Sequence, residues 1–163
     1  MLRFCVYQWA LNKDNLKAHI ERDNRINSCD YEYLVKLVVR YILNGEFRHP
    51  DLQNWFWDEN TDEIDHCCYQ GVKLYIVHRT TVSEANEYLI TSVSYGSCSV
   101  CDTLESIQAD NGYDDLPNEQ QVKDYMTLCK DIVCGFVHPF RNYWGESEGW
   151  QHMEIDNVME VDT

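Results

Sequence analysis

Cys98 and Cys101 form the only Cys-x-x-Cys spacing in the chain and are the first candidates for chemistry. Two thiolates at this spacing can share a tetrahedral zinc ion, which then needs two further ligands. The predicted last helix and its end supply candidates in Cys129, Cys134 and His138, and a second set is His66, Cys67 and Cys68. The sequence thus predicts a zinc site built on Cys98, Cys101, Cys129 and Cys134.

The same pair could instead carry out thiol–disulfide exchange, which is favoured when free N–H groups at a helix N-terminus stabilise the thiolate. Asp102 and Glu105 have the spacing of a capping box, so the helix is predicted to begin after the pair and not between its cysteines. The acidic surroundings are also expected to raise the thiol pKa. A third, structural interpretation has Gly96 forming a tight turn and both cysteines packing as small apolar side chains.

No constellation typical of an enzyme accompanies the pair. The chain has neither a Gly-rich phosphate loop nor a His-Glu-x-x-His helix, and carboxylate pairs are expected by chance in so acidic a sequence. The sequence therefore predicts no catalytic residue, and we expect a protein that is not an enzyme.

Charge is the most informative property of the sequence. The formal net charge of the 163 residues is -15, and 20 of the 28 acidic residues lie in three segments without Lys or Arg, at 49–72, 80–122 and 142–163. This composition argues against direct contact with nucleic acid or an anionic membrane, both of which need bases. It favours a basic protein partner, and a surface of one sign can act as a nucleic-acid mimic. Solubility alone is the simpler explanation of the same charge.

Aromatic residues next to these acids are candidates for anchoring such a partner. Trp55 and Trp57 are flanked by acids on a predicted short strand or turn, and Trp144 and Trp150 lie in the acidic C-terminal segment. The predicted partner-binding residues are Trp55, Trp57, Asp58, Glu59, Asp62, Glu63, Asp114 and Asp115.

Hydrophobic periodicity predicts an α+β fold with an antiparallel sheet. Alternation over residues 71–96, interrupted by a polar turn, predicts a central hairpin, and helical spacing over 30–44 and 119–137 predicts two main amphipathic helices packed on the sheet. Alternation over 2–9 predicts a first strand. A short polar helix is predicted to follow, starting within 12–15 and carrying Leu16, Ile20 and Asp23-Asn24 at helical spacing.

The domain organisation follows from the same patterns. Residues 1–141 are predicted to form one domain, and residues 142–163 an acidic tail. The sequence contains no signal peptide and no apolar run long enough for a membrane helix, so a cytoplasmic protein with reduced cysteines is expected.

Several segments in this order also form a recognisable pattern. They are Tyr-Gly-Ser-Cys-Ser-Val-Cys-Asp at 95–102, Tyr-Gln-Gly at 69–71, Leu-Cys-Lys-Asp-Ile at 128–132, Tyr-Gln-Trp at 7–9 and Cys-Asp-Tyr at 29–31. Over most of residues 1–140 the chain resembles a family of small, uncharacterised proteins encoded by bacteriophages and prophages. Val100 stands where the family pattern has Gly, so the loop is expected to differ locally. The resemblance implies phage origin and a bacterial host cytoplasm, and it implies no particular activity.

Overall fold

A computed structural model describes residues 3–48, 55–65, 70–80, 88–109 and 115–137. The elements follow in the order α1 (Arg3–Ile20), η1 (Ile26–Ser28), α2 (Tyr31–Val38), η2 (Val39–Leu43), β1 (Trp57–Asp65), β2 (Gly71–Arg79), β3 (Tyr88–Tyr95), α3 (Thr103–Gln108) and α4 (Glu119–Gly135). The α+β class predicted from the sequence is confirmed. The predicted tail at 142–163 lies outside the described residues.

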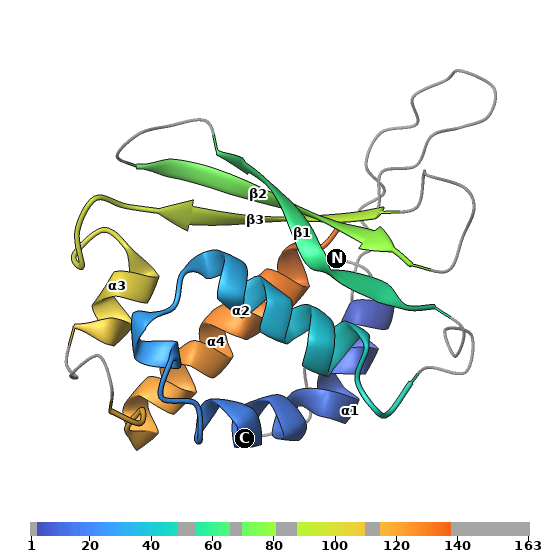
Figure 1. Ribbon diagram of the computed structural model, residues 1–163, viewed down its shortest axis with the longest axis horizontal. Helices are drawn as coiled ribbons and strands as arrows, with labels where there is room; N and C mark the ends of the chain where they lie inside the picture. The colour runs from blue at the N-terminus through green and yellow to red at the C-terminus, as the bar shows by residue number, and fades with distance from the viewer. Residues whose placement is uncertain (1–2, 49–54, 66–69, 81–87, 110–114, 138–163) are drawn as a thin grey trace.

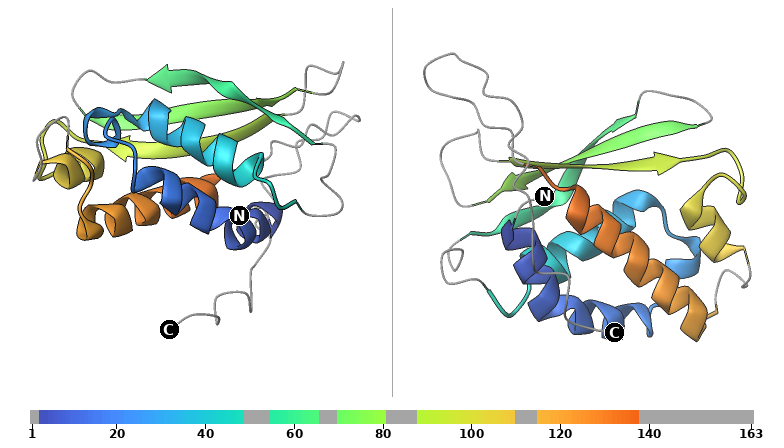
Figure 2. Two further views of the ribbon diagram at one scale, coloured as in Figure 1. Left: turned by 60° about the horizontal axis from the view of Figure 1, so that its bottom comes forward. Right: turned by 180° about the vertical axis from the view of Figure 1, so that it is seen from behind.

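The three strands form one antiparallel sheet in the order β1-β2-β3, and the predicted hairpin is β2 and β3. The register pairs Tyr75 with Thr91 and Val77 with Leu89. These four side chains are buried, because they lie on the face of the sheet that the helices cover. Figure 1 shows the sheet as one layer with α2 and α4 beneath it, and Figure 2 shows α1 on the same side of the sheet, beside α4.

Side chains that accept hydrogen bonds from backbone N–H groups mark the starts of α2 and α4. Asp30 accepts a hydrogen bond from the backbone N–H of Tyr33 and begins α2. Asn118 and Gln121 form a reciprocal capping box at the start of α4. The predicted helix over 30–44 is α2 continued by the π-helical turn η2, and the predicted helix over 119–137 is α4.

The predicted first strand over residues 2–9 is wrong, because this segment is the first half of α1. The residues that α1 buries are Cys5, Gln8, Asn12, Leu16 and Ile20, at helical spacing. Two of them are amides, and their polarity hides the helical period in the sequence. Burial is possible because the Gln8 amide donates to the Ile42 carbonyl (3.2 Å) and the Asn12 amide both donates to and accepts from the Phe47 backbone (2.7 and 3.0 Å).

The described residues contain no helix that is both long and apolar enough to cross a membrane.

Candidate functional site: a dithiol loop beside an acidic cleft

Residues 96–102, here called the dithiol loop, connect β3 to α3. The backbone N–H groups of Cys101 and Asp102 both donate to the Cys98 carbonyl at 2.9 Å, which closes a tight turn. Both cysteines are exposed and free, and their sulfur atoms lie 3.1 Å apart. Because a disulfide bond measures about 2.05 Å, the two thiols are in contact without being bonded.

Gly96 is required by the close packing of this turn. A Cβ atom at position 96 would lie 2.5 Å from the carbonyl carbon and oxygen of Cys101 and 2.7 Å from its sulfur. Only glycine lets the two ends of the loop approach this closely, and the approach holds the Cys101 thiol next to Cys98.

Hydrogen bonding lowers the pKa of Cys101. The side chain of Cys98 makes the largest contribution, followed by the backbone N–H of Ser97, and together they outweigh the effect of burial. The expectation that acidic surroundings raise the thiol pKa is therefore wrong for Cys101, because donors in direct contact dominate. The helix does begin after the pair, at Thr103, as predicted.

Asp102 fixes the loop to the rest of the fold. Its side chain is only 5% exposed and accepts hydrogen bonds from the N–H groups of Glu105 (3.1 Å) and Gly96 (2.9 Å) and from the Tyr31 hydroxyl (3.0 Å). A single carboxylate thus caps α3, ties the start of the loop to its end, and joins both to α2.

A cleft of about 480 Å³, here called the acidic cleft, opens beside Cys101 between the loop, α3 and α4. Its lining residues are Ser99, Val100, Cys101, Asp102, Thr103, Ser106, Ile107, Asp124, Thr127, Leu128 and Asp131. The lining thus contains three carboxylates and four hydroxyls, with no Lys or Arg. Val100 is 95% exposed at its edge. The cleft has a single sign of charge and offers acceptors to a cationic group.

The structure does not bring the predicted zinc ligands together. Cys129 is fully buried in the core, where burial raises its pKa to about 12, while Cys98 and Cys101 are exposed. Cys134 lies close enough to Cys5 to influence its pKa. Within the described residues no group of three or more His, Cys, Asp or Glu side chains could hold a metal ion. The alternative ligands His66, Cys67, Cys68 and His138 lie outside those residues.

The predicted partner anchors Trp55 and Trp57 lie just before β1 and at its start, and they are less exposed than predicted. Trp57 is 3% exposed, so its prediction as an exposed anchor is wrong. Its ring stacks on Phe4 with centroids 6.4 Å apart, and Asn44 hydrogen bonds both its backbone N–H (2.8 Å) and its carbonyl (2.7 Å). Trp55 is half-buried, with the Arg79 guanidinium 4.0 Å from its ring centre.

The acids of β1 are largely neutralised by neighbours. Within the described residues, bases or histidine face four of them. Arg40 pairs with Glu59 (2.5 Å), His78 with Asp62 (2.9 Å), and Lys73 with both Glu63 (2.8 Å) and Asp65 (3.9 Å). Although residues 49–72 contain no Lys or Arg, these acids of β1 are therefore paired with bases or histidine from other elements of the fold. Asp58 accepts from the N–H of Asn60 (2.9 Å), Asp115 is exposed, and Asp114 lies outside the described residues.

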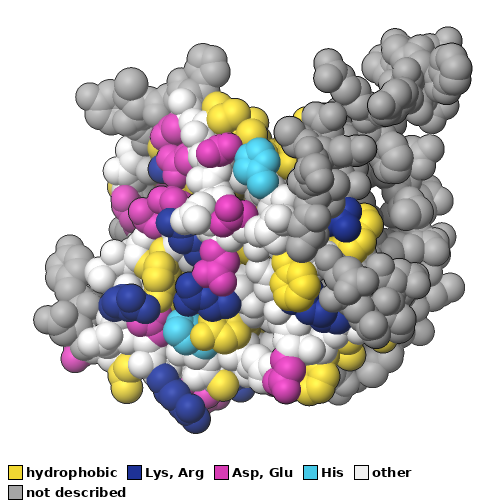
Figure 3. Space-filling view, turned by 45° about the vertical axis from the view of Figure 1, so that its right-hand side comes forward, with side chains coloured by type: hydrophobic (Ala, Val, Ile, Leu, Met, Phe, Trp, Pro, Cys, Tyr) yellow, Lys and Arg dark blue, Asp and Glu magenta, His cyan; other side chains and the backbone are white. Residues whose placement is uncertain are grey.

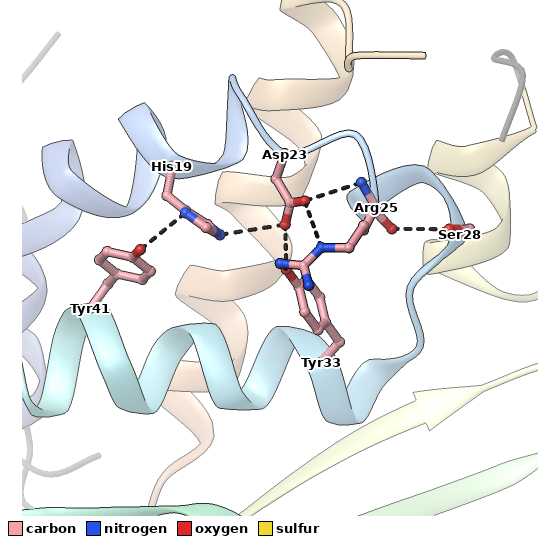
Figure 4. A network of polar contacts seen from close by, with 6 residues as sticks. All are labelled: His19, Asp23, Arg25, Ser28, Tyr33 and Tyr41. Atoms are coloured by element: carbon pink, nitrogen blue, oxygen red, sulfur yellow. Dashed lines mark hydrogen bonds and ion pairs between the residues drawn. The ribbon is translucent and has the colours of Figure 1, made fainter. Parts of the chain in front are cut away.

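A polar network that the sequence analysis missed joins the end of α1 to α2 and η2 (Figure 4). His19 Nδ1 lies 3.0 Å from the Tyr41 hydroxyl, and His19 Nε2 lies 3.4 Å from the Asp23 carboxylate. Asp23 also accepts from the Tyr33 hydroxyl and from Arg25 Nε (3.2 Å). The sequence carries no clear signal for this network, because Asp23 lies beyond the end of α1 at Ile20 and meets His19 only through the turn that follows the helix.

Comparison of the chain with protein-family models, with curated proteins and with solved structures finds no match. The functional argument therefore depends on the geometry described above.

Proposed function

We propose that the protein is a phage-encoded interaction protein that works in the host cytoplasm, where it binds and inhibits a basic host protein. A nucleic-acid-handling or defence enzyme is the class of target whose basic groove fits an acidic surface that mimics nucleic acid. The observation that carries the proposal is the acidic cleft, whose lining holds three carboxylates and no base in a chain with a net charge of -15.

The cleft supports this role better than β1 does. On β1 the carboxylates of Glu59, Asp62 and Glu63 already face Arg40, His78 and Lys73. Asp131 is exposed on α4, and among the described residues Asp124 accepts only from a neutral donor, the Gln120 amide (3.0 Å). A Lys or Arg of a partner can therefore enter the cleft without first displacing a base.

The test is affinity capture from bacterial lysate with nuclease present, using the wild type and two matched double variants. Asp124→Asn/Asp131→Asn removes two charges from the cleft, and Asp62→Asn/Glu63→Gln removes two from β1. We expect a basic protein to be captured at low salt, to be lost at about 1 M salt, where the Debye length is about 3 Å, and to be lost with the cleft variant. Retention by the cleft variant, or no captured protein, would contradict the proposal.

The contact between Cys98 and Cys101 favours a second candidate function, a thiol-redox module. In the reaction, the Cys101 thiolate attacks glutathione disulfide and displaces one glutathione thiolate. Cys98 then attacks the mixed disulfide and releases the second glutathione, which leaves an intramolecular disulfide. The 3.1 Å separation of the sulfur atoms and the lowered Cys101 pKa support this exchange. Titration against glutathione redox buffers measures it, and a pair that stays reduced in oxidised glutathione would exclude it.

A further inference from the structure

A second hollow lies where the end of α1 meets η2, and its chemistry is opposite to that of the acidic cleft. This hollow, here called the His19 groove, has a volume of about 530 Å³ and shares no lining residue with the cleft. Its lining consists of Asn15, Ala18, His19, Arg22, Arg40, Tyr41, Asn44, Gly45 and Glu46. Two guanidinium groups and one carboxylate thus line a groove in a protein whose overall charge is strongly negative.

The bases of the chain gather around this region. Eight of the 13 Lys and Arg residues precede residue 49. On the face drawn in Figure 3, Lys and Arg side chains lie mostly over the helices, while Asp and Glu side chains lie mostly over the sheet. The local potential near the groove is therefore more positive than the net charge suggests, because charges beyond about 10 Å are screened at physiological salt.

Three side chains in the groove suit an anionic group. The Arg22 side chain is exposed and makes no ion pair with any described residue. Arg40 pairs with Glu59, but both side chains are more than one-third exposed, and such surface pairs contribute little and can exchange partners. Tyr41 also lines the hollow, and its hydroxyl can act as a neutral donor.

The network behind the groove holds His19 in a defined orientation. Burial acts to raise the pKa of Asp23, but hydrogen bonds from Tyr33 and Arg25 outweigh it, so the net pKa is lowered and the carboxylate is ionised. The His19 imidazole lies between the Asp23 carboxylate, 3.4 Å from Nε2, and the Tyr41 hydroxyl, 3.0 Å from Nδ1, as Figure 4 shows. The contact with His19 therefore positions Tyr41 within the protein itself.

We propose that the His19 groove is a binding site for the phosphate group of a small ligand, held by Arg22, Arg40 and the Tyr41 hydroxyl. A phosphate offers several acceptor oxygens with two charges, and guanidinium groups match that geometry best. The other charged groups at the site are Glu46, Asp23 and Arg25, together with Glu59, which pairs with Arg40.

The experiment is an NMR titration of the intact protein with inorganic phosphate at low ionic strength, following the His19 ring signals. We expect saturable shifts of these signals as phosphate is added. Adenosine monophosphate and acetate form two further arms. The nucleotide should bind through the same residues, and acetate should bind more weakly because it carries a single charge.

Arg22→Gln is the decisive variant, since the exposed side chain has no described ion pair whose loss could unfold the protein. We expect it to weaken phosphate binding about tenfold, the usual loss for one charge-assisted hydrogen bond. Lys130→Gln makes the same charge change on α4 and should leave the affinity unchanged. Tyr41→Phe keeps the ring that packs on His19 at a centroid distance of 4.8 Å and should also weaken phosphate binding, because it removes the hydroxyl donor. Linear, non-saturable shifts, or equal losses in the Arg22 and Lys130 variants, would overturn the proposal.

Discussion

Replacement of Asp102 by alanine should destabilise the protein more than any other change of one surface-loop carboxylate. The side chain is the shared acceptor for Gly96, Glu105 and Tyr31, from three parts of the fold. Loss of a helix N-cap costs about 1 kcal/mol, and each buried donor left without an acceptor adds about 1 kcal/mol or more. Since the exposed ends of the loop can relax toward water, we expect a total of about 3 kcal/mol.

Urea denaturation followed by tryptophan fluorescence measures this free energy of unfolding. Asp102→Asn keeps one oxygen for the cap and should lose only about 1 kcal/mol. Asp115→Ala is the matched control, because only the backbone carbonyl of Asp115 is recorded in a hydrogen bond, from the Asn27 amide (2.8 Å), and it should stay within about 0.5 kcal/mol of the wild type.

A double-mutant cycle then isolates one contact. Tyr31→Phe removes the hydroxyl that donates to Asp102, and we expect a coupling energy with Asp102→Ala of about 1 kcal/mol. The reasoning is refuted if Asp102→Ala is as stable as the Asp115→Ala control, or if the cycle shows no coupling.

Three further predictions follow from the dithiol loop and the network at His19. Gly96→Ala should open the contact between Cys98 and Cys101, because the added Cβ would lie 2.5 Å from the Cys101 carbonyl. Mass spectrometry should then show slower disulfide formation than in the wild type, and an unchanged rate would contradict the prediction. In the native protein, a maleimide should label Cys98 and Cys101 within the time that leaves Cys5 unlabelled, since Cys5 is fully buried and burial raises its pKa; equal labelling would show that the core opens readily. Tyr33→Phe removes a hydrogen bond that lowers the pKa of Asp23, so it should reduce the free energy of unfolding at neutral pH. The difference from the wild type should shrink as the pH falls below the ordinary carboxyl value of 3.8 and through the lowered pKa. A difference in unfolding free energy that does not change with pH would refute this assignment.

The features that the sequence predicts well are local ones. The cap predicted at Asp102 depends on Glu105, only three positions away, and Asp102 begins α3 as expected. The hairpin was predictable because β2 and β3 are two apolar segments separated by a polar turn, and they pair with each other as antiparallel neighbours.

The features that the sequence did not predict depend on distant contacts. The first helix was missed because Gln8 and Asn12 look like solvent-exposed residues, and only their hydrogen bonds to residues more than 30 positions away make burial favourable. Counting charges along the chain overestimated the acidity of β1, since Arg40 and Lys73 come from neighbouring elements. The contact of His19 with Tyr41 likewise requires α1 to pack on η2.

The salt dependence of the affinity between the purified protein and its captured basic partner tests the central claim most directly. Isothermal titration across a series of salt concentrations should show a steep loss of affinity for the wild type, and a weaker starting affinity with a shallower slope for Asp124→Asn/Asp131→Asn. Equal affinities and slopes for the wild type and this variant would contradict the claim that the acidic cleft binds the partner.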